Sequence, residues 1–153
     1  MDYFVLEQFE NISISAVKTS EAKNAVLYKT CEINKLSRFD YIHKGSLISD
    51  RVKQLFERYL PQNKWTMTGY VDIEKGAQEI FWQMNLFKYI PLKDTVFRND
   101  GIIKMISIGD DAPPVIFKVT SPKGVVSDIV HISVAESLLR RKYLRLKLTR
   151  IQG

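Results

Sequence analysis

A strand, a helix and a second strand are predicted by the stretch Asp128-Ile-Val-His-Ile-Ser-Val-Ala-Glu-Ser-Leu-Leu-Arg-Arg-Lys-Tyr-Leu-Arg-Leu-Lys-Leu-Thr-Arg-Ile151. Ser133 and Glu136 have the spacing of a capping box, in which each side chain accepts a hydrogen bond from an N–H group that the first helical turn leaves unpaired. The helix is therefore expected to begin at Ser133 and to end at residue 142. Its apolar side carries Leu138 and Leu139, which we expect in the core.

The period of the sequence then changes from that of a helix to that of a strand. From Leu144 to Thr149, each leucine is followed by a polar residue. This two-residue alternation is typical of a strand with one buried face and one solvated face. We therefore expect Leu146 and Leu148 to be buried and Arg145 and Lys147 to be exposed.

The same stretch accounts for the net charge of the chain. From Arg140 onward the basic residues meet no acidic residue, and the formal net charge of +6 equals their sum. The basic tail consists of Arg140, Arg141, Lys142, Arg145, Lys147 and Arg150. Its charges could neutralise nucleic-acid phosphates. Alternatively, three of them offset the helix dipole and three line the solvated face of a strand.

A second amphipathic helix is predicted at about residues 49–60. Val52, Leu55, Phe56, Tyr59 and Leu60 follow the spacing of one helical face. Ser49 or Asp50 is expected to cap this helix, and Pro61 ends it because the residue before a proline avoids helical angles. Short apolar runs predict strands at 3–6, 12–17, 65–72, 79–86, 102–108, 115–120 and 129–132, with Thr19-Ser20-Glu21 as turn material.

These elements predict an α+β fold in one domain over residues 1–153. The strands follow one another through short turns, which leave no room for the helical crossovers of a parallel sheet. We therefore expect a mostly antiparallel sheet with two main helices packed against it. No low-complexity linker divides the chain, and 153 residues suffice for one core.

Composition favours a cytoplasmic protein. No apolar run approaches the roughly 18 residues of a membrane helix, and the first residues lack the basic start and long apolar stretch of a secretory signal. Cys31, the only cysteine, is typical of a reducing compartment, and we expect it to be half-buried.

No catalytic constellation is predicted. The two histidines, His43 and His131, lack metal-ligand spacing, and His131 lies within a predicted strand. The glycines do not cluster into a phosphate-binding loop. Paired carboxylates such as Asp110 and Asp111 lie in turn-rich sequence, where acids are usually solvated. We therefore expect no catalytic residue, metal ligand or cofactor, and no enzymatic activity.

Four stretches together resemble a family of bacterial immunity proteins. They are Leu47-Ile-Ser-Asp-Arg-Val-Lys-Gln-Leu-Phe-Glu57, residues 65–72, Phe81-Trp-Gln-Met-Asn85 and Ile132-Ser-Val-Ala-Glu-Ser-Leu-Leu-Arg-Arg141. The resemblance is to the immunity protein eleven group of polymorphic toxin systems, formerly a domain of unknown function. It covers about residues 46–151, whereas residues 1–45 diverge. It implies a non-enzymatic cytoplasmic protein that binds and neutralises a cognate toxin.

Two surfaces are candidates for binding such a partner. The basic tail favours a toxin with an acidic surface, because complementary potentials speed association and reject wrong partners. An acidic patch near Asp100 is the other candidate. The predicted partner-binding residues are Arg140, Arg141, Arg145, Lys147, Asp110 and Asp111. The alternative function is a small nucleic-acid-binding protein that uses the basic C-terminal strand and helix.

Overall fold

The computed structural model describes residues 2–142 and 144–153, which form two compact units. Unit 1 consists of Met1–Glu7, Leu86–Tyr143 and Lys147–Gly153. Unit 2 consists of Gln8–Asn85 and Leu144–Leu146. Because each unit needs distant parts of the chain, no single cut in the sequence separates them.

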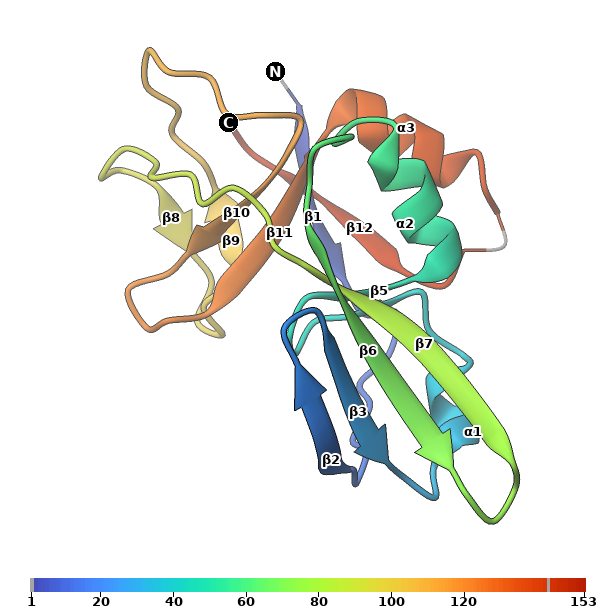
Figure 1. The fold of residues 1–153 in the computed structure, drawn as a ribbon. Coiled ribbons are helices and arrows are strands. Elements are labelled where there is room, and N and C mark those ends of the chain that lie inside the picture. Colours follow the sequence, from blue (N-terminus) through green and yellow to red (C-terminus); the bar gives the residue numbers. More distant parts are fainter. Residues whose placement is uncertain (1, 143) are drawn as a thin grey trace. The chain divides into compact units, whose positions relative to one another are not determined.

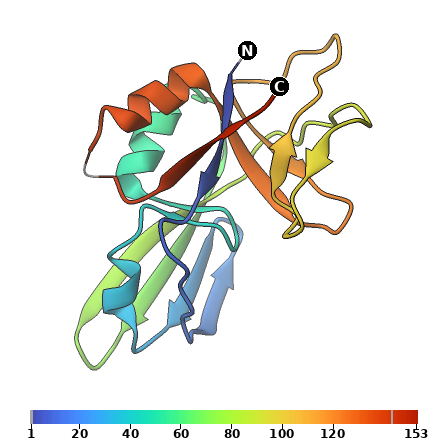
Figure 2. The same cartoon turned by 180° about the vertical axis from the view of Figure 1, so that it is seen from behind.

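Unit 1 is built on a four-stranded antiparallel sheet (Figure 1). Its strand order is β10 (Ile116–Thr120), β11 (Val126–His131), β1 (Tyr3–Glu7) and β12 (Lys147–Ile151). A small ribbon of β8 (Val96–Phe97) and β9 (Ile103–Met105) lies to one side of this sheet, and α3 (Ile132–Leu139) lies to the other (Figures 1 and 2).

Alternation along the strands explains the core of unit 1. Tyr3 and Val5 on β1 share a face with Ile129 of β11. Ile103 of β9 and the nearby Ile106 pack in the same cluster. An edge-to-face contact between the rings of Tyr3 and Phe117, 5.6 Å apart, extends the same layer. The buried cluster comprises Tyr3, Val5, Tyr89, Ile102, Ile103, Ile106, Phe117, Val119, Ile129 and Ile151.

Unit 2 contains a six-stranded sheet in which one pair of strands is parallel. Its order is β2 (Val17–Ala22), β3 (Ala25–Lys29), β6 (Trp65–Asp72), β7 (Ala77–Met84), β5 (Leu47–Ser49) and β4 (Tyr41–Ile42). Only the β3–β6 pair is parallel among the described strands of this sheet.

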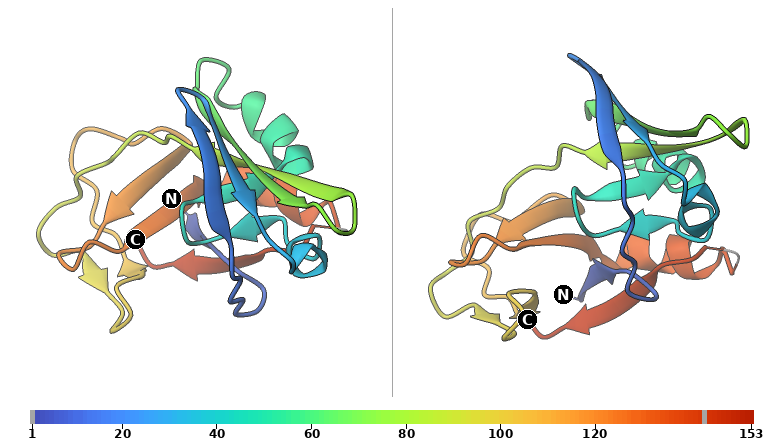
Figure 3. Two further views of the ribbon diagram at one scale, coloured as in Figure 1. Left: turned by 60° about the horizontal axis from the view of Figure 1, so that its bottom comes forward. Right: turned by 90° about the horizontal axis from the view of Figure 1, so that it is seen from below.

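The helices α1 (Ile33–Leu36) and α2 (Asp50–Glu57) lie on opposite sides of the sheet (Figure 3, left). The core under α1 comprises Ile33, Leu36, Phe39, Ile42, Leu47 and Phe81.

The α+β class predicted from the sequence is confirmed. The sheets are mostly antiparallel, α2 packs on β5 and β7, and α3 packs on β11 and β1. On α2, the expected apolar residues Val52, Leu55 and Phe56 are buried. This helix ends at Glu57, ahead of the predicted stop before Pro61. Among residues 2–142 and 144–153, no helix is both long enough and apolar enough to cross a membrane.

The first third of the chain differs most from prediction. The predicted strand at residues 12–17 is absent, and β2 instead occupies Val17–Ala22, across the expected turn Thr19-Ser20-Glu21. Every residue of β2 is exposed. Its sequence therefore shows no alternation, and the strand exists because β3 supplies a hydrogen-bonding edge. Cys31 is also exposed, where we expected a half-buried side chain.

The predicted start and end of α3 are both corrected by the structure. The N-cap is His131, whose Nδ1 accepts a hydrogen bond from the Ser133 N–H group at 3.2 Å. Strand β11 passes directly into the helix, so the imidazole caps the first turn and Ser133 lies inside it. The helix ends at Leu139 with Arg140 as its C-cap, which leaves Arg141 and Lys142 beyond the last turn.

The end of the helix also separates two adjacent leucines. Leu138 is 2% exposed, as predicted, whereas Leu139, about 100° further round the helix, is 63% exposed. We predict that Leu138→Ala lowers the free energy of unfolding by about 2–5 kcal/mol. Leu139→Ala, the matched control, should change it by less than about 0.5 kcal/mol. Urea denaturation measures both, and equal losses would contradict this placement.

The final alternating stretch is not one continuous strand. Residues 144–146 belong to unit 2, where the Asp40 N–H group donates to the Arg145 carbonyl and the Arg145 N–H group donates to the Asp40 carboxylate. Strand β12 begins only at Lys147. Arg145 and Lys147 are exposed as predicted. Leu146 and Leu148 are half-buried, not core, and Ile151 is the fully buried residue of β12.

Candidate protein-binding groove

Unit 1 exposes several large apolar side chains within one short segment. In the segment between β7 and β8, Phe87 is 60% exposed, Ile90 is 72% exposed and Leu92 is about half exposed. Single exposed apolar residues are ordinary on protein surfaces, but a group of them marks an interaction site more often than chance.

These side chains line one wall of a groove of about 420 Å³. The opposite wall is the loop after β9. We call this feature the apolar-acidic groove, and it is lined by Phe87, Lys88, Tyr89, Ile90, Leu92, Gly109, Asp110 and Asp111. The groove therefore combines exposed apolar surface with two neighbouring carboxylates.

Tyr89 ties the two walls together. Its ring is buried against Phe117, with ring centroids 5.6 Å apart. Its hydroxyl donates to the carbonyl oxygen of Asp111 at 3.0 Å and accepts from the Gly109 N–H group at 3.3 Å. One buried side chain thus holds the acidic loop at a set distance from the apolar wall.

The apolar wall is itself attached to the rest of unit 1. The Lys118 N–H group on β10 donates to Phe87, and the Tyr89 N–H group donates back to Lys118, both at 2.9 Å. Leu92 donates its N–H to Ser107 at 2.9 Å. Because the backbone on both sides is held in place, binding here would order little additional chain, which reduces the entropic cost of association.

The charge of the groove is set by its rim. Asp110 and Asp111 are exposed, and Lys88 is the only cation among the lining residues. Ionised carboxylates accept hydrogen bonds but donate none, so this rim suits arginine or lysine side chains. Asp100 does not line the groove, and its carboxylate accepts hydrogen bonds from Arg98 at 2.8 and 3.1 Å.

The residues of the basic tail do not line the apolar-acidic groove, and several of them already form local contacts. The Arg141 guanidinium donates to the Ser137 carbonyl at 2.7 Å, which satisfies a C-terminal group of α3. Lys147 pairs across the sheet with Glu7. Arg150 forms an ion pair with Asp2 at 2.7 Å. The basic tail therefore meets acids in the folded chain that the linear sequence does not place beside it.

Glu7 shows the effect of these contacts on a carboxylate. Burial would raise the pKa of Glu7, but hydrogen bonds from Arg98 and Thr149 outweigh it. The charges of Arg98 and Lys147 add to this, so the pKa of Glu7 lies below its ordinary value. The positive charge of Lys147 is thus partly balanced within unit 1.

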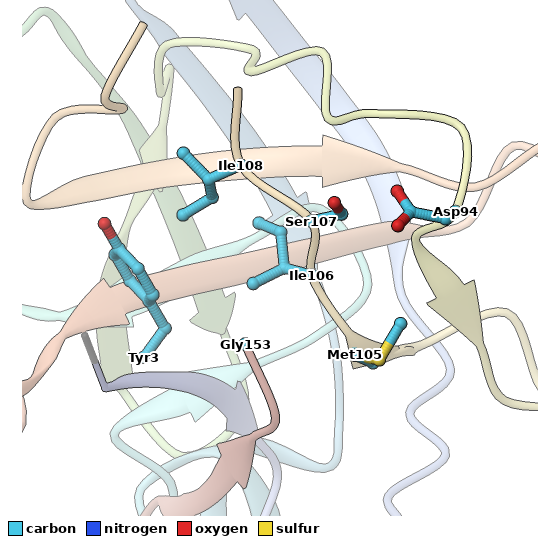
Figure 4. A pocket seen from close by; sticks show the side chains of 7 residues that line it. All are labelled: Tyr3, Asp94, Met105, Ile106, Ser107, Ile108 and Gly153. Atoms are coloured by element: carbon cyan, nitrogen blue, oxygen red, sulfur yellow. The ribbon is translucent and has the colours of Figure 1, made fainter. Parts of the chain in front are cut away.

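A second hollow of unit 1, of about 490 Å³, lies between β1 and the chain after β9 (Figure 4). Asp94 lies at one end beside Ser107, and Tyr3 lies at the other end beside Ile108 (Figure 4). Burial and the neighbouring Tyr89 raise the pKa of Tyr3.

The exposed apolar wall was missed by the sequence analysis. The run Phe87-Lys-Tyr-Ile-Pro-Leu92 is apolar enough for a buried strand, and only Pro91 indicates that it leaves the ladder. A rule that treats a proline-interrupted apolar run as exposed could have found it. Asp110 and Asp111, by contrast, were named from the sequence and lie at the groove.

No protein-family model, curated protein or solved structure matches the chain. Within residues 2–142 and 144–153, no group of three or more histidine, cysteine, aspartate or glutamate side chains could hold a metal ion.

Proposed function

We propose that this chain is a non-catalytic binding protein that neutralises a cognate bacterial protein toxin in the cytoplasm. The apolar-acidic groove is the observation that carries the proposal. The resemblance to immunity proteins suggests that the partner is a toxin. An inhibitor of a toxin needs a stable complementary surface and needs no catalytic group.

The composition of the groove supports protein binding. The central part of a protein interface is apolar and aromatic, and its rim is polar. Phe87, Ile90 and Leu92 supply the first property, and Asp110 and Asp111 supply the second. A standard interface buries about 800 Å² on each partner, so the groove would form the centre of a larger contact.

The partner is inferred from the same residues. An apolar side chain inserted between Ile90 and the acidic loop would remove both from water. Lysine or arginine beside that side chain would meet Asp110 and Asp111, and complementary charge would speed the encounter. We therefore expect a toxin whose contact surface is basic with an apolar residue at its centre, which differs from the acidic partner that the basic tail alone suggests.

Nucleic-acid binding has weaker support. Its candidate residues are the six cations of the basic tail, of which Arg150, Lys147 and Arg141 already have partners within unit 1. Affinity for nucleic acid would have to come from phosphate neutralisation and would fall steeply with salt.

The decisive experiment uses the neighbouring gene. The gene beside the one for this chain is expressed in a sensitive bacterium, alone and together with the chain, and growth is recorded. We expect growth arrest by the neighbour alone and rescue by co-expression. Direct binding of the two purified proteins should follow by calorimetry. If the neighbour is harmless, or if the chain neither binds nor rescues, the proposal is wrong.

A charge reversal on the basic tail separates the two functions. We predict that the double variant Arg145→Glu, Lys147→Glu keeps toxin protection. Its free energy of unfolding should fall by about 1 kcal/mol, because the new carboxylate at position 147 lies opposite Glu7. Thermal denaturation and the growth assay measure both effects. Lost protection in a folded variant would place the inhibitory surface on the tail.

A further inference from the structure

Unit 2 contains a cavity of about 350 Å³ on the side of its sheet that α1 covers. Apolar side chains come from the sheet, from α1 and from the chain that leads into β2. They are Ile12, Ile14, Val26, Leu36, Ile42 and Leu47. Pockets for small molecules start at roughly this volume and are similarly apolar.

Several polar side chains face the same cavity without a hydrogen-bond partner among the described residues. Tyr28, Thr68, Tyr70 and Gln83 line it, and none of their side chains makes a hydrogen bond to another residue in the described part of the chain. Thr68 is nonetheless buried. These side chains are therefore available to form hydrogen bonds with an occupant of the cavity.

The two tyrosines form one side of the polar set. Tyr28 on β3 and Tyr70 on β6 are stacked with ring centroids 5.2 Å apart. Burial and the neighbouring Tyr28 raise the pKa of Tyr70, so its phenol keeps its proton at neutral pH and can donate. Together with the Gln83 amide, these phenols offer several donors to an acceptor group.

Lys44 adds a positive charge, and it is the only charged residue that lines the cavity. It lies in the turn between β4 and β5, which the Ser46 N–H group closes by donating to His43 at 3.0 Å. Gly45 and Ser46 both have positive φ, 85° and 51°. Ser46 is the unusual case, because a non-glycine residue rarely adopts this conformation, and such strain is common at functional sites.

We infer that unit 2 binds a small amphipathic carboxylate, with its apolar body against the isoleucines and its acidic group toward Lys44 and the unpartnered donors. The volume leaves room for about twelve non-hydrogen atoms, since one water occupies about 30 Å³. This site lies wholly within unit 2 and does not depend on the proposed toxin binding in unit 1.

Decanoate is the probe that tests the inference, because its size fits this volume. Binding to the full chain is followed by calorimetry and by amide chemical shifts. We expect saturable binding at one site per chain, with shifts confined to residues around the cavity. Decyltrimethylammonium, which has the same chain and the opposite charge, should bind at least about fivefold more weakly. Equal affinity for both probes, or no saturable binding, would overturn the inference.

Two variants locate the site. Lys44→Ala should weaken decanoate binding about fivefold, because it removes the positive charge that faces the carboxylate. Lys44 is exposed, so the variant should retain the fold. Thr68→Phe should fill the cavity and abolish binding. Lys29→Ala, an exposed lysine of β3 outside the cavity, is the matched control and should leave the affinity unchanged. If Lys44→Ala binds like the parent, or if the control weakens binding equally, the assignment is wrong.

Discussion

Replacing Phe87 and Ile90 together by aspartate is expected to weaken toxin binding at least about a hundredfold and to abolish protection in the growth assay. Truncating a central interface residue commonly costs 2 kcal/mol or more, and each 1.4 kcal/mol is a factor of ten in affinity. Calorimetry with the purified partner measures the loss.

The double variant should fold like the parent. Both side chains are mostly exposed, so their replacement is expected to change the free energy of unfolding by less than about 0.5 kcal/mol per site. The matched control is Val17→Asp with Ile73→Asp, because these apolar residues of unit 2 are 69% and 68% exposed. Unchanged affinity in the groove variant, or an equal loss in the control, would move the binding surface elsewhere.

Asp40→Ala is expected to lower the free energy of unfolding by about 3 kcal/mol. Asp40 is buried, and its carboxylate accepts four hydrogen bonds at 2.6 Å. They come from the Ser49 hydroxyl, from Nε and Nη2 of Arg51, and from the Arg145 N–H group. Removing one member of a buried ion pair typically costs 3–5 kcal/mol. The lower end applies because the Arg51 side chain is 42% exposed and regains water.

The same carboxylate predicts how stability depends on pH. Burial would raise the pKa of Asp40, but hydrogen bonds from Arg51, Ser49 and the Arg145 N–H group outweigh it, so the folded pKa lies below the ordinary 3.8. Such a group stabilises the fold above the unfolded pKa and loses this contribution as the pH falls through the folded pKa. The parent should therefore lose stability below pH 3.8, and Asp40→Ala should lose less over the same range.

Urea denaturation followed by tryptophan fluorescence measures both effects. Trp65 and Trp82 are the only tryptophans, and both lie in unit 2 with Asp40. Glu21→Ala is the control, since this exposed glutamate of β2 pairs only with an exposed lysine and should contribute little. A loss for Asp40→Ala as small as that of the control would show that the network is energetically unimportant.

Part of the candidate site could be predicted from the sequence. Asp110 and Asp111 were named as an acidic patch because they lie in turn-rich sequence, where acids are usually solvated. Their partners in the groove could not be named, because Phe87, Ile90 and Leu92 look like core residues until the fold shows which side chains are covered. Likewise, Tyr89 lies 22 positions from Asp111, and only folding brings its hydroxyl to that loop.

The sequence by itself determined the α+β class and the elements with strong periodicity. The helical face of Val52, Leu55 and Phe56 follows from helical spacing. The strand Trp65–Asp72 follows from a local run of residues with high strand propensity. Only tertiary structure decided the other features. Strand β2 needs the edge of β3, residues 144–146 leave the alternating strand because Asp40 binds the Arg145 backbone, and His131 caps α3 because β11 ends there. In each case the structure depends on a hydrogen-bonding group or on the end of a strand, and the local sequence pattern does not encode the position of either.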